Sequence, residues 1–330
     1  MIPKPTDGTI SLIARSPDLD EAAIETVVTV PTFRRPEQIL ATLTSLARQA
    51  TPRRFAVITI ENDAEQAEGA AAAAARYASG AIEGLLIVAH NRGNCSAYNA
   101  GWETALLRFP NLRHLMVIDD DEVADPDWIE TMCRFAERGH DIVGGPQVPT
   151  FDGGGNAKWA RHPVFAAPYS TSGPVKALFS SGNLLVTKPV LAAMGPPFLD
   201  LRFNFLGGGD SDFLSRAAAR GFRLGWCAEA RVSEAIPARR TEWSWIRARS
   251  IRNGVISALV DRRRRPGSTG RATVILRSIA FAALAPWRGL RAAMRSGLPI
   301  AFLDPTLFAA GRLLAEFGYA REQYREPEKN

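Results

Sequence analysis

The feature that most constrains the fold is an alternation of apolar runs with stretches of helical periodicity. Runs rich in β-branched residues lie at 26–33, 55–63, 84–91 and 114–118, as is typical of buried strands. Between the first two, Ile39, Leu40, Leu43 and Leu46 recur at helical spacing after Pro36, a residue favoured in a first helical turn. Strands that alternate with helices in this way predict an α/β fold with a mostly parallel, Rossmann-like sheet and helices on both faces.

The composition indicates a globular protein of a reducing compartment. Of 330 residues, 46% are hydrophobic, enough for one large domain or two ordinary ones. The three cysteines lie far apart without a CxxC pair, which argues against a disulfide framework or a structural zinc. The start of the chain lacks the pattern of a signal peptide, and no apolar run reaches the roughly 18 residues of a spanning helix. We therefore expect a cytoplasmic protein.

Polar clusters follow three of the predicted strands. They are Thr32-Phe33-Arg34, Glu61-Asn62-Asp63 and Asp119-Asp120-Asp121. Ligands of open α/β sheets bind at the carboxyl ends of the strands, so these clusters predict a binding site at one edge of the sheet.

The acidic run IDDDE, residues 118–122, has two readings. Clustered carboxylates suit Mg²⁺ or Mn²⁺, which commonly bind substrate phosphates as well. The alternative is a solvated turn, but the apolar strand before it places the run at a sheet edge. We expect Glu122 and Asp125 to be outer charges, and Asp125 could simply cap the next helix.

The segment GGGDSDF, residues 207–213, also has two readings. Asp210 could cap the helix that follows, and Asp212 suits the positive end of that helix. Alternatively, the glycines let a ligand approach the backbone, and Asp210 behind them is placed to act as a general base. The turn in NRGNCSAYNAG, residues 91–101, could bring backbone amides to the same ligand.

Other kinds of site are disfavoured by missing patterns. The sequence has no Walker-type phosphate loop, no GxGxxG after the first strand and no GxSxG elbow, which disfavours NTPases, dinucleotide oxidoreductases and serine hydrolases. The four histidines form no metal-binding pair, and we interpret all of them as structural. Nucleic-acid binding is disfavoured because the net charge is only +6 and the arginines cluster late in the chain.

The last part of the chain is basic and amphipathic. The stretch DRRRRPGSTGR, residues 261–271, resembles a linker, and five arginines follow among apolar residues: Arg271, Arg277, Arg288, Arg291 and Arg295. Such segments can lie on the inner face of an anionic cell membrane. They can equally be helices packed on the rest of the protein, and the sequence leaves both open.

Taken together, the segments PTFRRP, END, NRGN, YNAGW, IDDDE, GGGDSDF and EARVSEAIPARR resemble glycosyltransferase family 2. The resemblance covers about residues 27–260 and is most similar to succinoglycan-type exopolysaccharide glucosyltransferases. It implies the GT-A fold and inverting transfer from a nucleotide sugar, usually a UDP-sugar, to a glycan or lipid-linked saccharide. The implied organisation is a leader over 1–25, a catalytic domain over 26–260 with nucleotide-binding and acceptor-binding halves meeting near 150, and a helical region over 261–330.

The resemblance also implies roles for individual residues. Asp119 and Asp121 would bind the metal, with Glu234 nearby, and Asp120 would face the donor. Asp210 would deprotonate the acceptor hydroxyl. The nucleotide would be held by Pro31, Thr32, Arg34, Glu61, Asn62, Asp63, Asn91, Gly93, Asp119 and Asp120. The acceptor and diphosphate region would include Gly208, Gly209, Asp212, Arg240, Trp243 and Arg247.

Two departures from the family pattern bear on specificity. Many members carry Glu before the base aspartate, where this chain has Gly209, so contacts to the acceptor differ. Many also carry Asp where Glu61 or Asn62 stands, which weakens the expectation of uracil. Two other functions compete: a sugar-nucleotide nucleotidyltransferase, which expects a glycine-rich first loop with a lysine that PTFRRP lacks, and a non-catalytic nucleotide-sugar sensor or scaffold, which expects a missing base or metal ligand.

Overall fold

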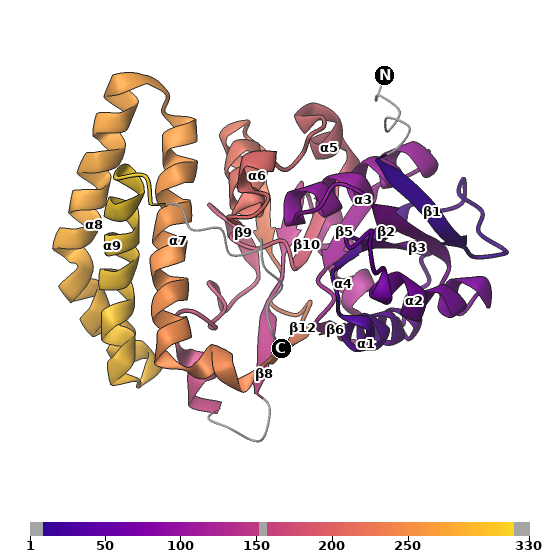
Figure 1. Cartoon of the computed structure of the whole chain (residues 1–330), viewed down its shortest axis with the longest axis horizontal. Coiled ribbons are helices and arrows are strands. Elements are labelled where there is room, and N and C mark those ends of the chain that lie inside the picture. The colour runs from indigo at the N-terminus through magenta and orange to yellow at the C-terminus, as the bar shows by residue number, and fades with distance from the viewer. Residues whose placement is uncertain (1–8, 152–156, 320–330) are drawn as a thin grey trace. The chain divides into compact units, whose positions relative to one another are not determined.

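The computed structural model describes residues 9–151 and 157–319, which form two compact units (Figure 1). The sheet unit comprises the described residues up to 147 together with 169–234. The helical unit comprises 148–151, 157–168 and 235–319. Each unit is described by itself.

The sheet unit is built on a nine-stranded sheet in the order β1-β4-β3-β2-β5-β10-β7-β11-β9. Strands β2, β3, β4 and β5 run parallel, as predicted, while β1, β10 and β9 run antiparallel to their neighbours. The strand bounds are β1 (Ile10–Arg15), β2 (Thr26–Thr32), β3 (Phe55–Glu61), β4 (Gly84–Ala89), β5 (His114–Ile118), β7 (Ile142–Gly144), β9 (Gly173–Val175), β10 (Asn183–Thr187) and β11 (Leu224–Trp226).

The connecting helices follow from the apolar periodicity. In α1 (Pro36–Ala47), Ile39, Leu43 and Leu46 are fully buried against the sheet core, and Pro36 occupies the first turn. The others are α2 (Glu68–Ala78), α3 (Asn94–Arg108), α4 (Trp128–Glu137), α5 (Lys188–Met194), the short η3 (Leu201–Phe203) and α6 (Gly209–Ala219). The predicted α/β class with a helical C-terminal part is confirmed.

Two parts of the sheet differ from the prediction. The stretch we read as a leader contains β1, which pairs with β4 as an edge strand. The apolar stretch DIVGGPQV, residues 141–148, reads as one strand in the sequence, but the structure divides it into β7 and β8 (Gln147–Phe151). Pro146 has no N–H for a ladder bond, and a Cβ on Gly145 would lie 2.4 Å from the carbonyl oxygen of Ala230.

Two short strands complete the sheet unit at the acidic run. β6 (Glu122–Ala124) pairs antiparallel with β12 (Val232–Ile236), and this pairing places Glu234 opposite Glu122.

The helical unit contains three helices that pack on one another, with α9 (Asp304–Glu316) between α7 (Trp243–Arg264) and α8 (Gly267–Ser296) (Figure 1). Glycines let α7 and α9 approach closely, since a Cβ on Gly311 would lie 1.9 Å from the carbonyl oxygen of Ile251. The short helices are η2 (Ala157–Arg161), η4 (Ala238–Thr241) and η5 (Pro299–Leu303).

The predicted linker over 261–271 is wrong for most of its length. Helix α7 continues to Arg264 and α8 starts at Gly267. Asp261 explains the continuation, because its carboxylate pairs with Arg265, Arg277 and Arg312 and so ties this turn to the neighbouring helices. Within the described residues, no helix is long and apolar enough to cross a membrane.

Candidate active site

The candidate site lies where the carboxyl ends of β2, β3 and β5 meet. The ladder between β2 and β5 ends at the pair Thr29–Val117, two residues before Pro31. Because β10 runs antiparallel to β5, its amino end comes to the same edge, with Asn183 opposite Ile118. The start of β10, about sixty residues after the acidic run in the chain, therefore lies at the site.

Asp120 and Asp121 share one arginine. Arg35 Nη1 donates to Asp120 Oδ1 at 2.9 Å and to Asp121 Oδ2 at 2.8 Å. Thr32 Oγ1 donates to the other oxygen of Asp120 at 2.8 Å, and Asp120 is buried. The predicted nucleotide residue Thr32 therefore positions an acid of the run.

Asp119 is held by a buried tyrosine. Tyr98 Oη, on α3, donates to Asp119 Oδ1 at 2.6 Å and accepts from Ser181 Oγ at 3.1 Å. Burial and the charge of Asp121, together with Asp120 and Glu234, raise the pKa of Asp119 to about 7. Burial and the charges of Asp119 and Asp210 raise the pKa of Tyr98 well above its usual range. The acidic run and Asp210 thus act on the same side chain.

Glu122 is not the outer charge that we expected. It is fully buried, and its carboxylate accepts from the Asp119 backbone N–H at 2.9 Å and from the side chain of Gln147. Burial and the charges of Asp119 and Glu234 raise its pKa well above the usual range. A Cβ on Gly182 would lie 2.8 Å from oxygens of both Asp119 and Glu122, so a larger residue here would displace these carboxylates.

The chemistry of the acids fits a divalent cation. The charges of Asp121, Asp120 and Glu234 act on the buried carboxylate of Asp119 and raise its pKa, and a cation would offset that repulsion. Mg²⁺ commonly binds through one or two carboxylates plus substrate phosphates. No group of three or more His, Cys, Asp or Glu side chains forms a metal site within residues 9–151 and 157–319.

The residues predicted to hold the nucleotide base are bonded to the protein itself. Glu61 is fully buried and accepts from the backbone N–H groups of Asp63 and Ala70. Asn62 accepts from the Gly93 N–H at 2.7 Å and donates to the Asn91 carbonyl at 2.9 Å. These bonds fix the shape of the edge, so a base there would meet a preformed surface.

Arg34 and Asp63 form an ion pair of 2.5 Å. Burial alone would raise the pKa of Asp63, but the hydrogen bonds from Arg34 and from backbone amides lower it below its usual range. Arg34 also lies over the ring of Phe33, with 5.1 Å between guanidinium and ring centroid.

Asn204 attaches the loop before Asp210 to the start of α3. Its side chain donates to the Arg92 carbonyl at 2.9 Å and accepts from the Ser96 N–H at 3.0 Å. Gly93 has φ +126°, and a Cβ there would lie 2.2 Å from the Asn204 side chain. Gly93 is therefore required for this loop contact, a role distinct from lining a nucleotide pocket.

Asp210 and Asp212 have different surroundings on α6. Asp210 is half-buried, and its Oδ1 accepts from the Ser211 N–H at 2.7 Å. Asp212 is buried and pairs with Arg216 at 2.8 Å. Gly208 is the left-handed N-cap residue of α6, with φ +93°. Of these two acids, Asp210 is the one whose charge raises the pKa of Tyr98.

Three predicted residues lie in the helical unit. Trp243 is the first residue of α7 and is 39% exposed, Arg247 is one turn further and exposed, and Arg240 lies over the ring of Trp245 at 5.8 Å. Their predicted closure over the diphosphate stays a prediction.

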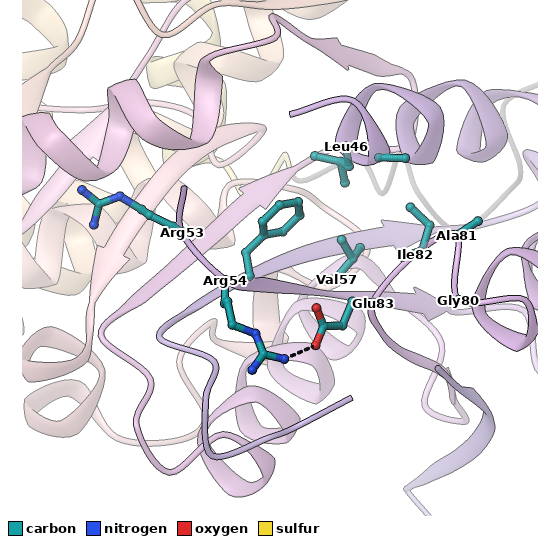
Figure 2. Close-up of a pocket in the computed structure, with 10 residues that line it drawn as sticks. Leu46, Arg53, Arg54, Val57, Gly80, Ala81, Ile82 and Glu83 are labelled. Atoms are coloured by element: carbon teal, nitrogen blue, oxygen red, sulfur yellow. Dashed lines mark hydrogen bonds and ion pairs between the residues drawn. The ribbon is translucent and has the colours of Figure 1, made fainter. Parts of the chain in front are cut away.

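A pocket of about 290 Å³ lies at the start of β3, at the end of the strand opposite to Glu61. Figure 2 shows residues that line it. Phe55 and Arg54 line it, and Arg54 pairs with Glu83 at 2.9 Å. Arg53, which also lines the pocket, pairs with Glu130 and Glu137. None of the acidic-run residues lines this pocket, so we do not assign the chemistry to it.

The sequence model of glycosyl transferase family 2 matches residues 27–191, half of the chain. The chain belongs to glycosyl transferase family 2. It is therefore a glycosyltransferase, and its sheet unit has the GT-A fold of that family.

Solved structures of the same fold include TarS 1–349 from S. aureus in complex with UDP, at 13% identity and a TM-score of 0.51 over 93% of this chain and 98% of that one. The mannosyltransferase PcManGT from Pyrobaculum calidifontis, in complex with GDP-Man and Mn²⁺, has 15% identity and a TM-score of 0.59 over 91% and 90%. At these identities the likeness shows the fold alone. A search of curated proteins found no significant match.

Sequence reasoning missed several residues at this glycosyltransferase site. Arg35 stands beside the predicted Arg34, and no sequence signal distinguishes which arginine meets the acids. Tyr98 lies in the quoted YNAGW segment, so its motif was visible but its role was not. Ser181 and Gln147 come to the site from segments that no local pattern connects with the acidic run. Glu122 was visible in that run, but its burial was not.

The departure at Gly209 has a steric cause. A Cβ there would lie 2.5 Å from Cys95 Sγ, so the side chain that many family members carry before the base aspartate meets a buried thiol in this chain.

Proposed function

We propose that this protein is an inverting, metal-dependent glycosyltransferase that moves a sugar from a nucleotide sugar, UDP being the expected nucleotide, to a hydroxyl of a glycan or lipid-linked saccharide. The expected role is bacterial surface or exopolysaccharide synthesis. The observation that carries the proposal is that Tyr98, which donates to Asp119 at 2.6 Å, also has its pKa raised by the charge of Asp210. Asp119 would act on the leaving diphosphate through the metal, and Asp210 would deprotonate the attacking hydroxyl.

The donor side rests on the acidic run. Asp119 and Asp121, with Glu234 beside them, are the residues that would hold Mg²⁺ or Mn²⁺. The bound ion would offset the charge that develops on the departing diphosphate. Tyr98 and Arg35 keep the carboxylates of Asp119 and Asp121 oriented, and Asp120 is held by Thr32 at the end of β2. Solved relatives of the fold in complex with UDP and with GDP-Man and Mn²⁺ support a nucleotide donor and a metal.

The acceptor side rests on Asp210. Its carboxylate accepts a hydrogen bond from the Ser211 amide at the start of α6, which fixes the direction of the carboxylate. Asp210 takes the proton of the acceptor hydroxyl as that oxygen attacks the anomeric carbon. A single displacement opposite the leaving diphosphate inverts the anomeric centre.

The first test is a panel of nucleotide sugars with Mn²⁺ and saccharide acceptors, reading release of nucleoside diphosphate. We expect Asp210→Asn to lower turnover at least about 100-fold while donor binding, measured by calorimetry, is kept.

Asp121→Ala should instead lose metal-dependent donor binding. Asp127→Asn, at an exposed acid outside the cluster, is the control and should retain activity.

The competing function, a nucleotide-sugar sensor, predicts a different result. Donor binding without metal-dependent release from any nucleotide sugar would favour it. Full turnover by Asp210→Asn would remove Asp210 from the role of base.

A further inference from the structure

Helix α8 presents a stripe of large apolar side chains to solvent. Leu276, Trp287 and Met294 are 66%, 59% and 75% exposed, and Ile279 and Leu290 are also exposed. At about 100° per residue, these five side chains fall within an arc of about 80°. Isolated exposed apolar residues are common, but a contiguous stripe marks an interaction surface.

The opposite side of α8 is the one that packs inside the helical unit. Val274, Ser278, Ala285 and Gly289 are buried there. A Cβ on Gly289 would lie 2.3 Å from the carbonyl oxygen of Phe302 in η5. The stripe is therefore not part of the core that α8 makes with α9 and η5.

Basic residues run along one flank of the stripe. α8 contains five arginines and no aspartate or glutamate, and Arg277, Arg288, Arg291 and Arg295 fall within an arc of about 60° at 100° per residue. Arg277 pairs with Asp261, while Arg288 and Arg291 lie over Phe281 and Trp287. Among the described residues, Arg288, Arg291 and Arg295 have no acidic partner within ion-pair distance.

We propose that this outer face of α8 binds the surface of an anionic membrane, with the helix lying parallel to the lipid plane. Apolar side chains on one face with arginines at its border match the acyl boundary and the anionic headgroups of such a surface. A second copy of the chain fits less well, because a symmetric contact through this face would bring the two sets of arginines together.

The proposal does not depend on the transfer chemistry, because none of these residues belongs to the candidate site. If a lipid-linked saccharide is the acceptor, membrane binding through α8 would bring the enzyme and its acceptor to one surface.

The test is cosedimentation of the full chain with phosphatidylcholine vesicles, with and without phosphatidylglycerol. We expect binding only to the anionic vesicles. Trp287→Glu should lower the partition constant about tenfold or more. Arg288→Gln should lower it about fivefold, and salt should weaken the binding.

Leu12→Glu is the matched control, since Leu12 is 49% exposed on β1, and it should leave vesicle binding unchanged. Thermal unfolding verifies that each variant folds. Equal binding to neutral vesicles, or binding unchanged by Trp287→Glu, would overturn the proposal. So would absence of vesicle binding combined with a dimer, seen by sedimentation velocity, that Trp287→Glu dissociates.

Discussion

At the scale of single residues, the site depends on side chains that hold the acids in place. Tyr98 does this for Asp119, Arg35 for Asp120 and Asp121, and Gln147 for Glu122. Like charges gathered in a buried place repel one another, so each hydrogen bond that orients one acid also lowers the cost of keeping it ionised.

Tyr98→Phe isolates one of these bonds. Removing the hydroxyl takes away the donor to Asp119. The pKa of that carboxyl group then rises, and the carboxylate binds a cation less tightly. We expect Mn²⁺ affinity, measured by electron paramagnetic resonance without substrate, to weaken about tenfold.

Tyr77→Phe is the matched control for this change. Tyr77 is also fully buried, but its hydroxyl bonds to Thr59 Oγ1 at 2.7 Å, away from the acids. An equal loss of Mn²⁺ affinity in the two variants would show that Tyr98 acts only through folding.

At the scale of elements, β5 is the strand that the site depends on most, since the acidic run follows directly from its last residue. Its first residue, His114, pairs with Thr26 of β2 and Thr187 of β10. Burial, and to a lesser degree the charges of Arg113 and Arg53, lower the pKa of His114 to about 4. The folded protein therefore keeps this histidine neutral.

That burial predicts a pH dependence of stability. Between the unfolded pKa of about 6.5 and the folded pKa of about 4, the unfolded chain binds the extra proton, so stability falls as the pH falls. From pH 7 to pH 5 we expect the wild type to lose about 2 kcal/mol more unfolding free energy than His114→Phe. Urea denaturation at both pH values measures the difference, and parallel losses in the two proteins would contradict it.

At the scale of the whole molecule, the two units have separate cores. The sheet unit is centred on apolar strands, whereas the helical unit contains a buried arginine, Arg312, which is 1% exposed. Arg312 bonds to Asp261 at 2.8 Å and to Ser257 and Ser278, and lies over the ring of Phe281. One side chain of α9 thus joins α7 and α8.

Two arginines that share Asp261 allow a comparison within the helical unit. We expect Arg312→Ala to lower the unfolding free energy by about 3 kcal/mol, because the change removes a buried partner from a hydrogen-bonded charge network. Arg277→Ala, at a residue 43% exposed, should cost less than about 1 kcal/mol. Chemical denaturation followed by circular dichroism measures both free energies of unfolding. Similar losses in the two variants would show that burial does not determine how much each arginine contributes.

Local patterns in the sequence were sufficient for much of this protein. The apolar runs and helical spacing determined β2, β3, β4, β5 and the helices between them, because residue periodicity and burial are properties of a short window. The position of the aspartates after β5 followed from the same reasoning, and so did the expectation that parallel strand ends bring separate clusters together.

Only the tertiary structure decided how the site is assembled. The reversed direction of β10, the edge pairing of β1 and the pairing of β6 with β12 join segments far apart in the chain. The register between such strands depends on packing between distant segments, which cannot be inferred from a short stretch of sequence. Glu122 lies in the pairing of β6 with β12. The role of Tyr98 and the choice of Arg35 over Arg34 depend instead on where α3 and the start of α1 lie at the edge of the sheet.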